Sequence, residues 1–339
     1  MIRLKKGVNL GGFLSQCSEY TNEHYDTFIT EEDIQIIADM NFDHVRLPVD
    51  YEVIETPEGE EIMGNYHYID DTIKWCKKRG MNVILDVHKT WGYFFDNASK
   101  AGLNTLFDSD EAKERFLHLW ERLSARYGKY HDTVAMELLN EVVNPEYCDR
   151  WNELIGRTVA VIRKNAPKTT IIYGGVEWNS AATLKLLEAP ADKNTIFTFH
   201  YYEPLLFTHQ KAPWVPTISP ELKVHYPDEM SWYRAESEKI GFQGLPCVNS
   251  PAKTMGVEYH EEMIMEAITA AKKMGVTLYC GEFGVIDRAD EFDAIRWYKD
   301  VLELFKKYDI GYALWSYKEM DFGIMGGKYT RLREFLKEQ

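Results

Sequence analysis

The chain has 339 residues, 45% of them hydrophobic, and a formal net charge of −15. This length and apolar content allow a large buried core, and single barrel domains commonly reach this size. The negative charge, with no basic stripe in the sequence, argues against nucleic acid or an anionic membrane as a partner, and no apolar run is long enough to span a bilayer.

The cysteines and the N-terminal residues indicate in which cellular compartment the protein is expected. The chain has five scattered cysteines and no CxxC pair, so neither a zinc site nor a disulfide framework is indicated. Three of the first six residues are basic, but no apolar stretch follows them, so we expect no secretion signal. These features predict reduced thiols and a cytoplasmic location, or a secreted protein if a leader has been removed.

Short apolar runs alternate with amphipathic helical stretches along the chain. The expected strands cover residues 7–12, 44–50, 82–88, 134–141, 170–175, 195–202, 277–284 and 311–317. The first expected helix begins at Thr30 with a capping pattern and acidic residues in its first turn. The other expected helices cover residues 70–79, 109–127, 150–164, 181–187, 260–274, 291–308 and 329–338.

Eight strands, each followed by a helix, predict a (β/α)8 TIM barrel. An open doubly wound sheet is the alternative, but residues 7–12 read Gly-Val-Asn-Leu-Gly-Gly, which lacks its GxGxxG phosphate-binding pattern. Residues 203–258 interrupt the alternation and are rich in proline, tryptophan and tyrosine. We therefore predict one catalytic domain over residues 1–339, with 203–258 as a subdomain inserted after strand six on the C-terminal rim.

Two expected strands end on glutamate. Residues 138–141 read Leu-Leu-Asn-Glu, and residues 279–284 read Tyr-Cys-Gly-Glu-Phe-Gly. An ionised carboxylate beside apolar residues is costly unless a partner or a chemical task holds it there. Because barrel enzymes keep their catalytic groups at the C-terminal ends of the strands, Glu141 and Glu282 are expected to form a pair. Paired carboxylates are the arrangement that glycoside hydrolysis uses.

The other expected strands also carry polar or aromatic residues near their ends. These residues are Arg46, Asp50, Asp86, His88, His200, Tyr201, Tyr202, Trp315 and Tyr317. Structural alternatives remain open for several of them. Arg46 could serve as an ion-pair partner of Asp86 or Asp50, the histidines could be satisfied core residues, and Trp315 could pack in the core. Asp86 and Glu137 are expected to be structural rather than catalytic.

These strings resemble glycoside hydrolase family 5, a clan-A family of retaining β-glycanases that includes cellulases. The resemblance covers essentially the whole chain, and the branch with a subdomain after strand six, as in certain clostridial endoglucanases, is the most similar. Yeast-type exo-β-1,3-glucanases share the strings at 9–12 and 138–141. The resemblance rests on residues 9–12, 44–48, 85–88, 137–141, 199–202, 281–284 and 315–317.

The resemblance implies a role for each matching residue. Glu141 is expected to be the acid/base and Glu282 the nucleophile. Asn140 is expected to hold the sugar 2-hydroxyl. Trp315 is expected to stack on the sugar beside the nucleophile. The residues expected to bind substrate are Arg46, His88, Asn140, His200, Tyr202 and Trp315.

We therefore predict a retaining hydrolase of β-1,4 or mixed-linkage glucan oligo- or polysaccharides, acting by double displacement with no metal or organic cofactor. An exo-β-1,3-glucanase or β-glucosidase and a β-mannanase remain alternatives on the same scaffold. So do a non-catalytic carbohydrate-binding protein and a metal-dependent barrel enzyme. The aromatic loop at 89–95 could wall off one end of the site or stack on sugars, so exo and endo action both stay open.

Overall fold

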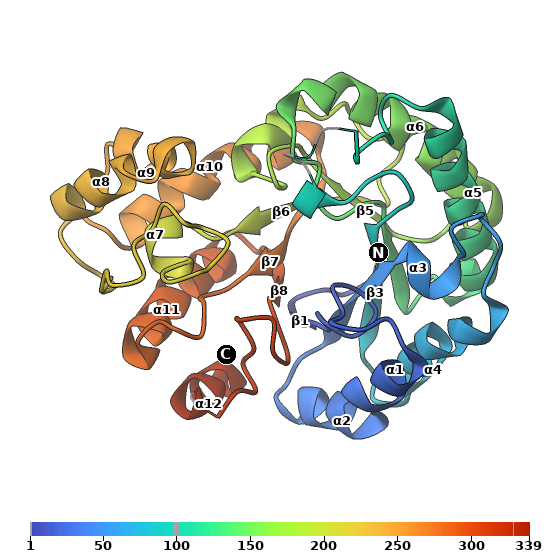
Figure 1. Ribbon diagram of the computed structural model, residues 1–339, viewed down its shortest axis with the longest axis horizontal. Helices are drawn as coiled ribbons and strands as arrows, with labels where there is room; N and C mark the ends of the chain where they lie inside the picture. The colour runs from blue at the N-terminus through green and yellow to red at the C-terminus, as the bar shows by residue number, and fades with distance from the viewer. Residues whose placement is uncertain (1, 98–99, 101, 328) are drawn as a thin grey trace.

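The computed structural model describes the chain except for residues 1, 98–99, 101 and 328 (Figure 1). Eight parallel strands form a closed barrel, in which each strand pairs with the next and β8 pairs with β1. The predicted (β/α)8 barrel is confirmed, and every expected strand overlaps an observed one. The strands are β1 (Lys6–Asn9), β2 (His44–Asp50), β3 (Asn82–Lys89), β4 (Val134–Glu137), β5 (Ile171–Gly174), β6 (Thr195–Tyr201), β7 (Thr277–Phe283) and β8 (Gly311–Leu314).

Helices surround the barrel (Figure 1). The α-helices are α1 (Asn22–Phe28), α2 (Glu31–Asp39), α3 (Tyr51–Ile54), α4 (Tyr66–Lys78), α5 (Asp110–Tyr127), α6 (Cys148–Asn165), α7 (Leu205–Thr208), α8 (Met230–Glu238), α9 (Leu245–Asn249), α10 (Val257–Met274), α11 (Glu291–Lys307) and α12 (Thr330–Glu338). The 3-10 helices are η1 (Met63–Asn65), η2 (Phe95–Asn97), η3 (Gly128–Tyr130), η4 (Pro145–Tyr147), η5 (Ala181–Leu186) and η6 (Gly241–Gly244). None of the described helices is both long enough and apolar enough to cross a membrane.

The sequence predicted helices correctly where a capping motif or a long amphipathic pattern was present. Helix α2 begins after Thr30, whose backbone N–H donates to the Asp33 carboxylate at 2.9 Å, as the capping pattern predicted. The seven-residue helix α1 was not predicted, because so short an element carries little apolar periodicity. The expected helix at 181–187 is the 3-10 helix η5.

The side chains that face into the barrel change character along each strand. Residues two apart on a strand share a face. Toward the N-terminal ends, an apolar cluster fills the barrel, and its members are Leu4, Ile84, Ala135, Ile172, Ile196, Tyr279 and Ala313. Two residues after Ile84 on β3 comes Asp86, and two residues after Ala135 on β4 comes Glu137; both are fully buried. The polar groups therefore lie over an apolar floor.

Strand β4 ends earlier than the sequence predicted. It stops at Glu137, so Asn140 and Glu141 lie on the irregular segment that follows it. Backbone hydrogen bonds hold this segment to its neighbours: the N–H of Leu138 donates to Ile172 at 3.0 Å, and that of Asn140 donates to Val87 at 3.1 Å. The segment is therefore fixed from both sides although it belongs to no strand.

Residues 203–258 leave the barrel after β6 and contain α7, α8, η6 and α9, which project to one side (Figure 1). A buried hydrogen-bonded chain anchors them. The Tyr226 hydroxyl bonds to His260 Nε2 at 2.7 Å and donates to Asp300 at 2.7 Å, and His260 Nδ1 lies 2.6 Å from the Tyr201 hydroxyl. Burial lowers the pKa of His260 to about 3, so the ring is neutral at pH 7 and joins both tyrosines.

Replacing His260 should weaken this anchor. In His260→Ala, the buried Tyr201 hydroxyl loses its partner, which should lower the free energy of unfolding by about 1–3 kcal/mol in urea denaturation. The matched control is His118→Ala, whose side chain is 65% exposed and which should change that free energy by about 0.5 kcal/mol or less. Equal losses in the two variants would contradict the anchoring role.

Candidate active site

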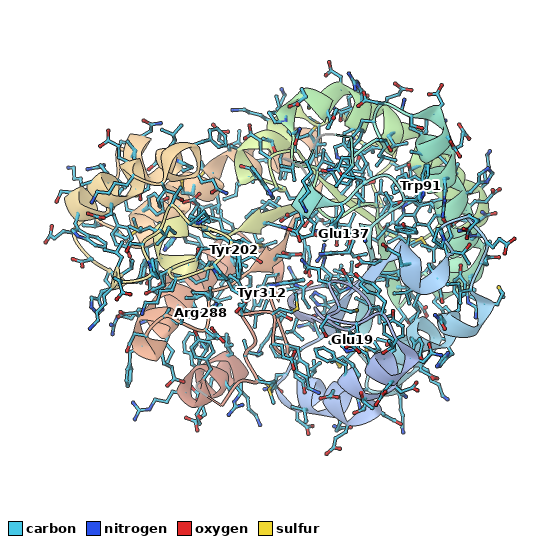
Figure 2. All side chains as sticks on the ribbon, in the orientation of Figure 1. Glu19, Trp91, Glu137, Tyr202, Arg288 and Tyr312 are labelled. Carbon is cyan, nitrogen blue, oxygen red and sulfur yellow. The ribbon has the colours of Figure 1, made fainter. Side chains whose placement is uncertain are left out.

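Arg46 occupies the centre of the site and is fully buried. Its guanidinium contacts carboxylates from three other strands. Nε lies 2.7 Å from Glu137, Nη1 lies 2.8 Å from Glu282, and Nη2 lies 3.0 Å from Asp86. Asp86 and Glu137 are direct partners in the β3–β4 register, which explains why both reach the same cation. Figure 2 shows Glu137 near the centre of the barrel.

Charge and hydrogen bonding together hold Arg46 in place. Burial disfavours the charged guanidinium, but the surrounding carboxylates outweigh this effect and raise the pKa of Arg46. Its two Nη atoms also donate to the side-chain oxygens of Asn9 and Asn140, each at 2.9 Å. The oxygen end of the Asn140 amide therefore faces Arg46, and its NH2 end points elsewhere.

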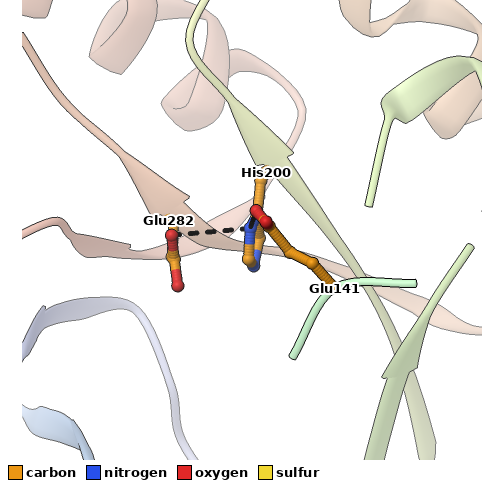
Figure 3. Close-up of side chains that lie close together, drawn as sticks. All are labelled: Glu141, His200 and Glu282. Atoms are coloured by element: carbon orange, nitrogen blue, oxygen red, sulfur yellow. Dashed lines mark hydrogen bonds and ion pairs between the residues drawn. The ribbon is translucent and has the colours of Figure 1, made fainter. Parts of the chain in front are cut away.

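Glu141, His200 and Glu282 meet at the C-terminal ends of the strands (Figure 3). His200 Nδ1 lies 2.7 Å from Glu141 Oε1 and 3.5 Å from Glu282 Oε2. One ligand-type atom from each of the three residues lies within 4.8 Å of the others. The Tyr202 hydroxyl donates to Glu282 Oε2 at 3.1 Å. A register shift between Cys280 and Phe283 accompanies Glu282, which pairs with His200 across β6 and β7.

The two glutamates have different surroundings. The Glu141 side chain is 10% exposed, and burial raises its pKa to about 7; His88 and Arg46 oppose the rise, and Asp96 adds to it. Burial also lowers the pKa of His200 to about 4, so the ring beside Glu141 is neutral at pH 7. Glu282, in contrast, is in direct contact with a cation. One carboxyl group can thus hold a proton near neutral pH while the other is ion-paired.

His88 and Trp315 extend the same network. His88 Nδ1 lies 2.7 Å from Asp86, and its ring stacks on Trp315 with centroids 5.7 Å apart and planes 8° apart. Trp315 follows the end of β8 and is only 7% exposed. The eight residues predicted to be catalytic or substrate-binding therefore lie in one connected set of contacts around Arg46.

Sequence reasoning missed Asn179. This residue follows β5, is 1% exposed, and donates from Nδ2 to the backbone carbonyl of Asn140 at 2.6 Å. It belongs to three consecutive residues with positive φ, 177–179, a conformation that is uncommon outside glycine. Neither periodicity nor a motif marks such a turn, so no sequence signal pointed to it.

The cluster of Glu141, His200 and Glu282 is also spaced closely enough to hold a metal ion, and it is the one such group among the residues that the structure describes. The Arg46 guanidinium already lies 2.8 Å from Glu282 and would repel a cation there. We assign no metal to these residues, because the carboxylate that a metal would need is in use by an arginine.

Comparison with known proteins adds the family. A sequence model described as cellulase (glycosyl hydrolase family 5) matches residues 5–321. The chain belongs to glycoside hydrolase family 5. As a member of this family it is a glycosidase that hydrolyses β-glucan. The predicted family and reaction class are thereby confirmed.

Similar proteins cover the whole family 5 barrel. Cellodextrinase A of Ruminococcus flavefaciens is 39% identical over 305 residues, which are 90% of this chain and 83% of that protein. Endoglucanase C of Acetivibrio thermocellus is 39% identical over 331 residues, which are 96% and 94% of the two chains. Thermotoga maritima Cel5A has been solved with cellobiose, at 28% identity and a TM-score of 0.74 over 98% of this chain and 97% of that one. It has also been solved with mannotriose, at 28% identity and a TM-score of 0.73 over 99% and 96%.

The unusual protonation of Glu141 can be measured directly. In a carboxyl carbon NMR titration, the signal that Glu141→Gln removes should titrate with a midpoint near pH 7. Asp96→Asn removes a negative charge that favours the protonated form, so this midpoint should fall in that variant. Asp110→Asn, at a carboxylate that is 98% exposed, is the control and should leave it unchanged. A midpoint near the ordinary glutamate value of about 4.3 in the unmodified protein would contradict the assignment.

Proposed function

We propose that this family 5 enzyme cleaves β-1,4-linked gluco-oligosaccharides with retention of configuration, with Glu141 as the acid/base and Glu282 as the nucleophile. The observation that supports this most is how close the two carboxyl groups lie beside His200: a carboxylate oxygen of Glu141 and one of Glu282 lie within 4.8 Å of each other. Retaining enzymes need their carboxyl groups about 5–5.5 Å apart, whereas inverting enzymes leave about 6.5–9.5 Å for a water molecule.

In the first step, a Glu282 oxygen attacks the anomeric carbon as the bond to the leaving oxygen breaks. Glu141 gives its proton to that oxygen, so the departing sugar leaves as a neutral alcohol. Arg46 and Tyr202 hold the Glu282 carboxylate in position with contacts of 2.8 and 3.1 Å. A covalent glycosyl ester on Glu282 is the product of this step.

In the second step, Glu141 has lost its proton and acts as a base. It takes a proton from water while the water oxygen attacks the anomeric carbon, and the bond to Glu282 breaks. A pKa of about 7 suits both steps, because neither protonation state of Glu141 is costly near neutral pH.

The sugar ring is proposed to lie against Asn140, His88, His200 and Trp315. The oxygen of the Asn140 amide is held by Arg46, which leaves the NH2 end to donate to the sugar 2-hydroxyl. Such a contact can strengthen as charge develops in the transition state. The net charge of −15 supports a neutral glucan as the partner rather than nucleic acid or an anionic membrane. The cytoplasmic location stays a prediction from the sequence.

The names of two relatives support the β-1,4 linkage, since one is a cellodextrinase and the other an endoglucanase, each 39% identical to this chain. The second candidate substrate is a β-mannan, because Thermotoga maritima Cel5A has been solved with mannotriose as well as cellobiose. Short soluble cello-oligosaccharides are the substrate that we favour.

A mechanism-based label tests the nucleophile. A 2-deoxy-2-fluoro cellobioside with a good leaving group should trap an ester on Glu282, seen as a mass increase in the peptide that contains residues 279–284. Glu282→Gln should take up no label. Label recovered on another residue would reject Glu282 as the nucleophile.

A panel of oligosaccharides tests the substrate. Cello-oligosaccharides should give the highest kcat/KM, followed by mixed-linkage glucan fragments, with β-1,3-gluco- and β-1,4-manno-oligosaccharides behind them. The first product seen by NMR should carry the β-anomeric configuration. A higher kcat/KM on manno- or β-1,3-linked oligosaccharides would overturn the linkage, and an initial α-anomer would overturn the retaining mechanism.

A further inference from the structure

Asn179 hydrogen-bonds to two neighbours of Glu141, Asn140 and His200, but does not contact Glu141 itself. Its side-chain Nδ2 donates to the backbone carbonyl of Asn140 at 2.6 Å and lies 3.4 Å from His200 Nε2. Its own backbone carbonyl accepts the N–H of His200 at 2.9 Å. Asn140 precedes Glu141 in the chain, and His200 Nδ1 lies 2.7 Å from Glu141. One buried amide thus joins the two elements that hold the Glu141 carboxyl group.

The turn around Asn179 is built to present this amide. Its two preceding residues also have positive φ, and their backbone N–H groups donate to Val143 at 3.1 Å and Val142 at 3.3 Å, just after Glu141. Gly174 leaves room for the side chain, because a Cβ there would lie 2.3 Å from Asn179 Oδ1. Backbone bonds on both sides and a glycine beneath fix the amide in one place.

The orientation of the amide follows from its partners. A carbonyl oxygen can only accept a hydrogen bond, so the end that faces the Asn140 carbonyl must be the NH2 group. The same NH2 group faces His200 Nε2, and this nitrogen must then be the acceptor. Since His200 is neutral at pH 7, its proton lies on Nδ1, which faces Glu141 and Glu282.

We infer that Asn179 is a positioning residue that holds His200 in the tautomer protonated on Nδ1, so that His200 donates a hydrogen bond to Glu141 and cannot accept its proton. This inference rests on the proposed acid/base role of Glu141. In the other tautomer, Nδ1 would carry no proton and would lie 2.7 Å from Glu141 Oε1. It would then accept a hydrogen bond from the protonated Glu141 carboxyl group. The proton that the leaving oxygen needs would then point at the ring.

The surroundings of His200 leave little space for another partner at Nε2. A Cβ on Gly281 would lie 3.2 Å from Nε2, so the glycine backbone packs against that side of the ring. Among the residues that the structure describes, Asn179 is therefore the hydrogen-bonding group at Nε2, while Glu141 and Glu282 face Nδ1. Aspartate at this place would have no NH2 group and would instead accept a hydrogen bond from Nε2–H, which requires the ring proton to lie on Nε2.

The tautomer can be read without any substrate. Nitrogen NMR of histidine-labelled protein separates protonated from bare ring nitrogens, and the His200 signals are those that His200→Asn removes from the set of 10 histidines. In the unmodified protein, His200 should be protonated at Nδ1 and bare at Nε2, whereas Asn179→Asp should protonate Nε2. Protonation at Nε2 in the unmodified protein would overturn the inference, whatever the enzyme's substrate or mechanism.

Leaving-group dependence tests the consequence for catalysis. Phenyl β-cellobioside needs a proton on its leaving oxygen, whereas 2,4-dinitrophenyl β-cellobioside needs almost none. Asn179→Asp should therefore lower kcat/KM for the phenyl substrate by about 10²-fold, within the range of general acid catalysis, and for the dinitrophenyl substrate by only a few-fold. The control is Asn194→Ala, which removes a side chain that donates to the Lys168 carbonyl at 2.6 Å outside the site; both rates should stay unchanged.

Two kinetic outcomes would count against the role. Equal losses on both substrates would mean that Asn179 is merely structural, and no loss on either would mean that the tautomer is set by something else. Failure of the proposed function itself would look different, since the fluoro-cellobioside would then leave Glu282 unlabelled while the His200 tautomer could still be as inferred.

Discussion

The geometry of this site depends on one buried arginine. A guanidinium removed from water is stable only if carboxylates and hydrogen-bond acceptors replace its hydration, and Arg46 has carboxylates at 2.7, 2.8 and 3.0 Å. These partners come from β3, β4 and β7, so the ion pairs fix the relative positions of four strands, β2 included. The structural and functional interpretations of Arg46 are therefore one interpretation, because the charge that holds the barrel rim together is the same charge that orients Glu282.

The alternation of side chains along each barrel strand positions the other polar groups of the site. Inward-facing positions alternate along each strand, so an apolar layer is followed by a polar layer at the next inward position. Ile84 and Ala135 belong to the apolar layer, and Asp86 and Glu137 to the polar one. Arg46, Asp86 and Glu137 in the polar layer are fully buried above the apolar layer, and their removal from water strengthens the electrostatic contacts among them.

What the sequence predicts well is what local pattern determines. Buried strands, the Thr30 cap and a glutamate at the end of an apolar run each leave a signal within a few residues. The features that the sequence did not predict are those whose positions depend on contacts between residues far apart in the chain. Asn179 reads as an ordinary polar residue, and only the left-handed turn at 177–179 turns it toward His200. The sequence also did not predict that β4 ends at Glu137. The residues after it are held in an irregular conformation by backbone hydrogen bonds to β3 and β5, which no local pattern reveals.

The partners of each side chain also separate the groups that stay fixed from the one that changes. Arg46 holds Glu282 and Asn140, and Asp86 holds His88, so none of these groups waits for a substrate to find its place. Such preorganisation lowers the cost of reorganisation during reaction. Glu141 is different, because its direct partner is a neutral histidine rather than a cation. A group that must give up a proton and take one back needs both of its states to be accessible. A permanent ion pair would remove one of them, so the absence of a cation in contact with Glu141, among the contacts that the structure describes, is itself part of how the site is built.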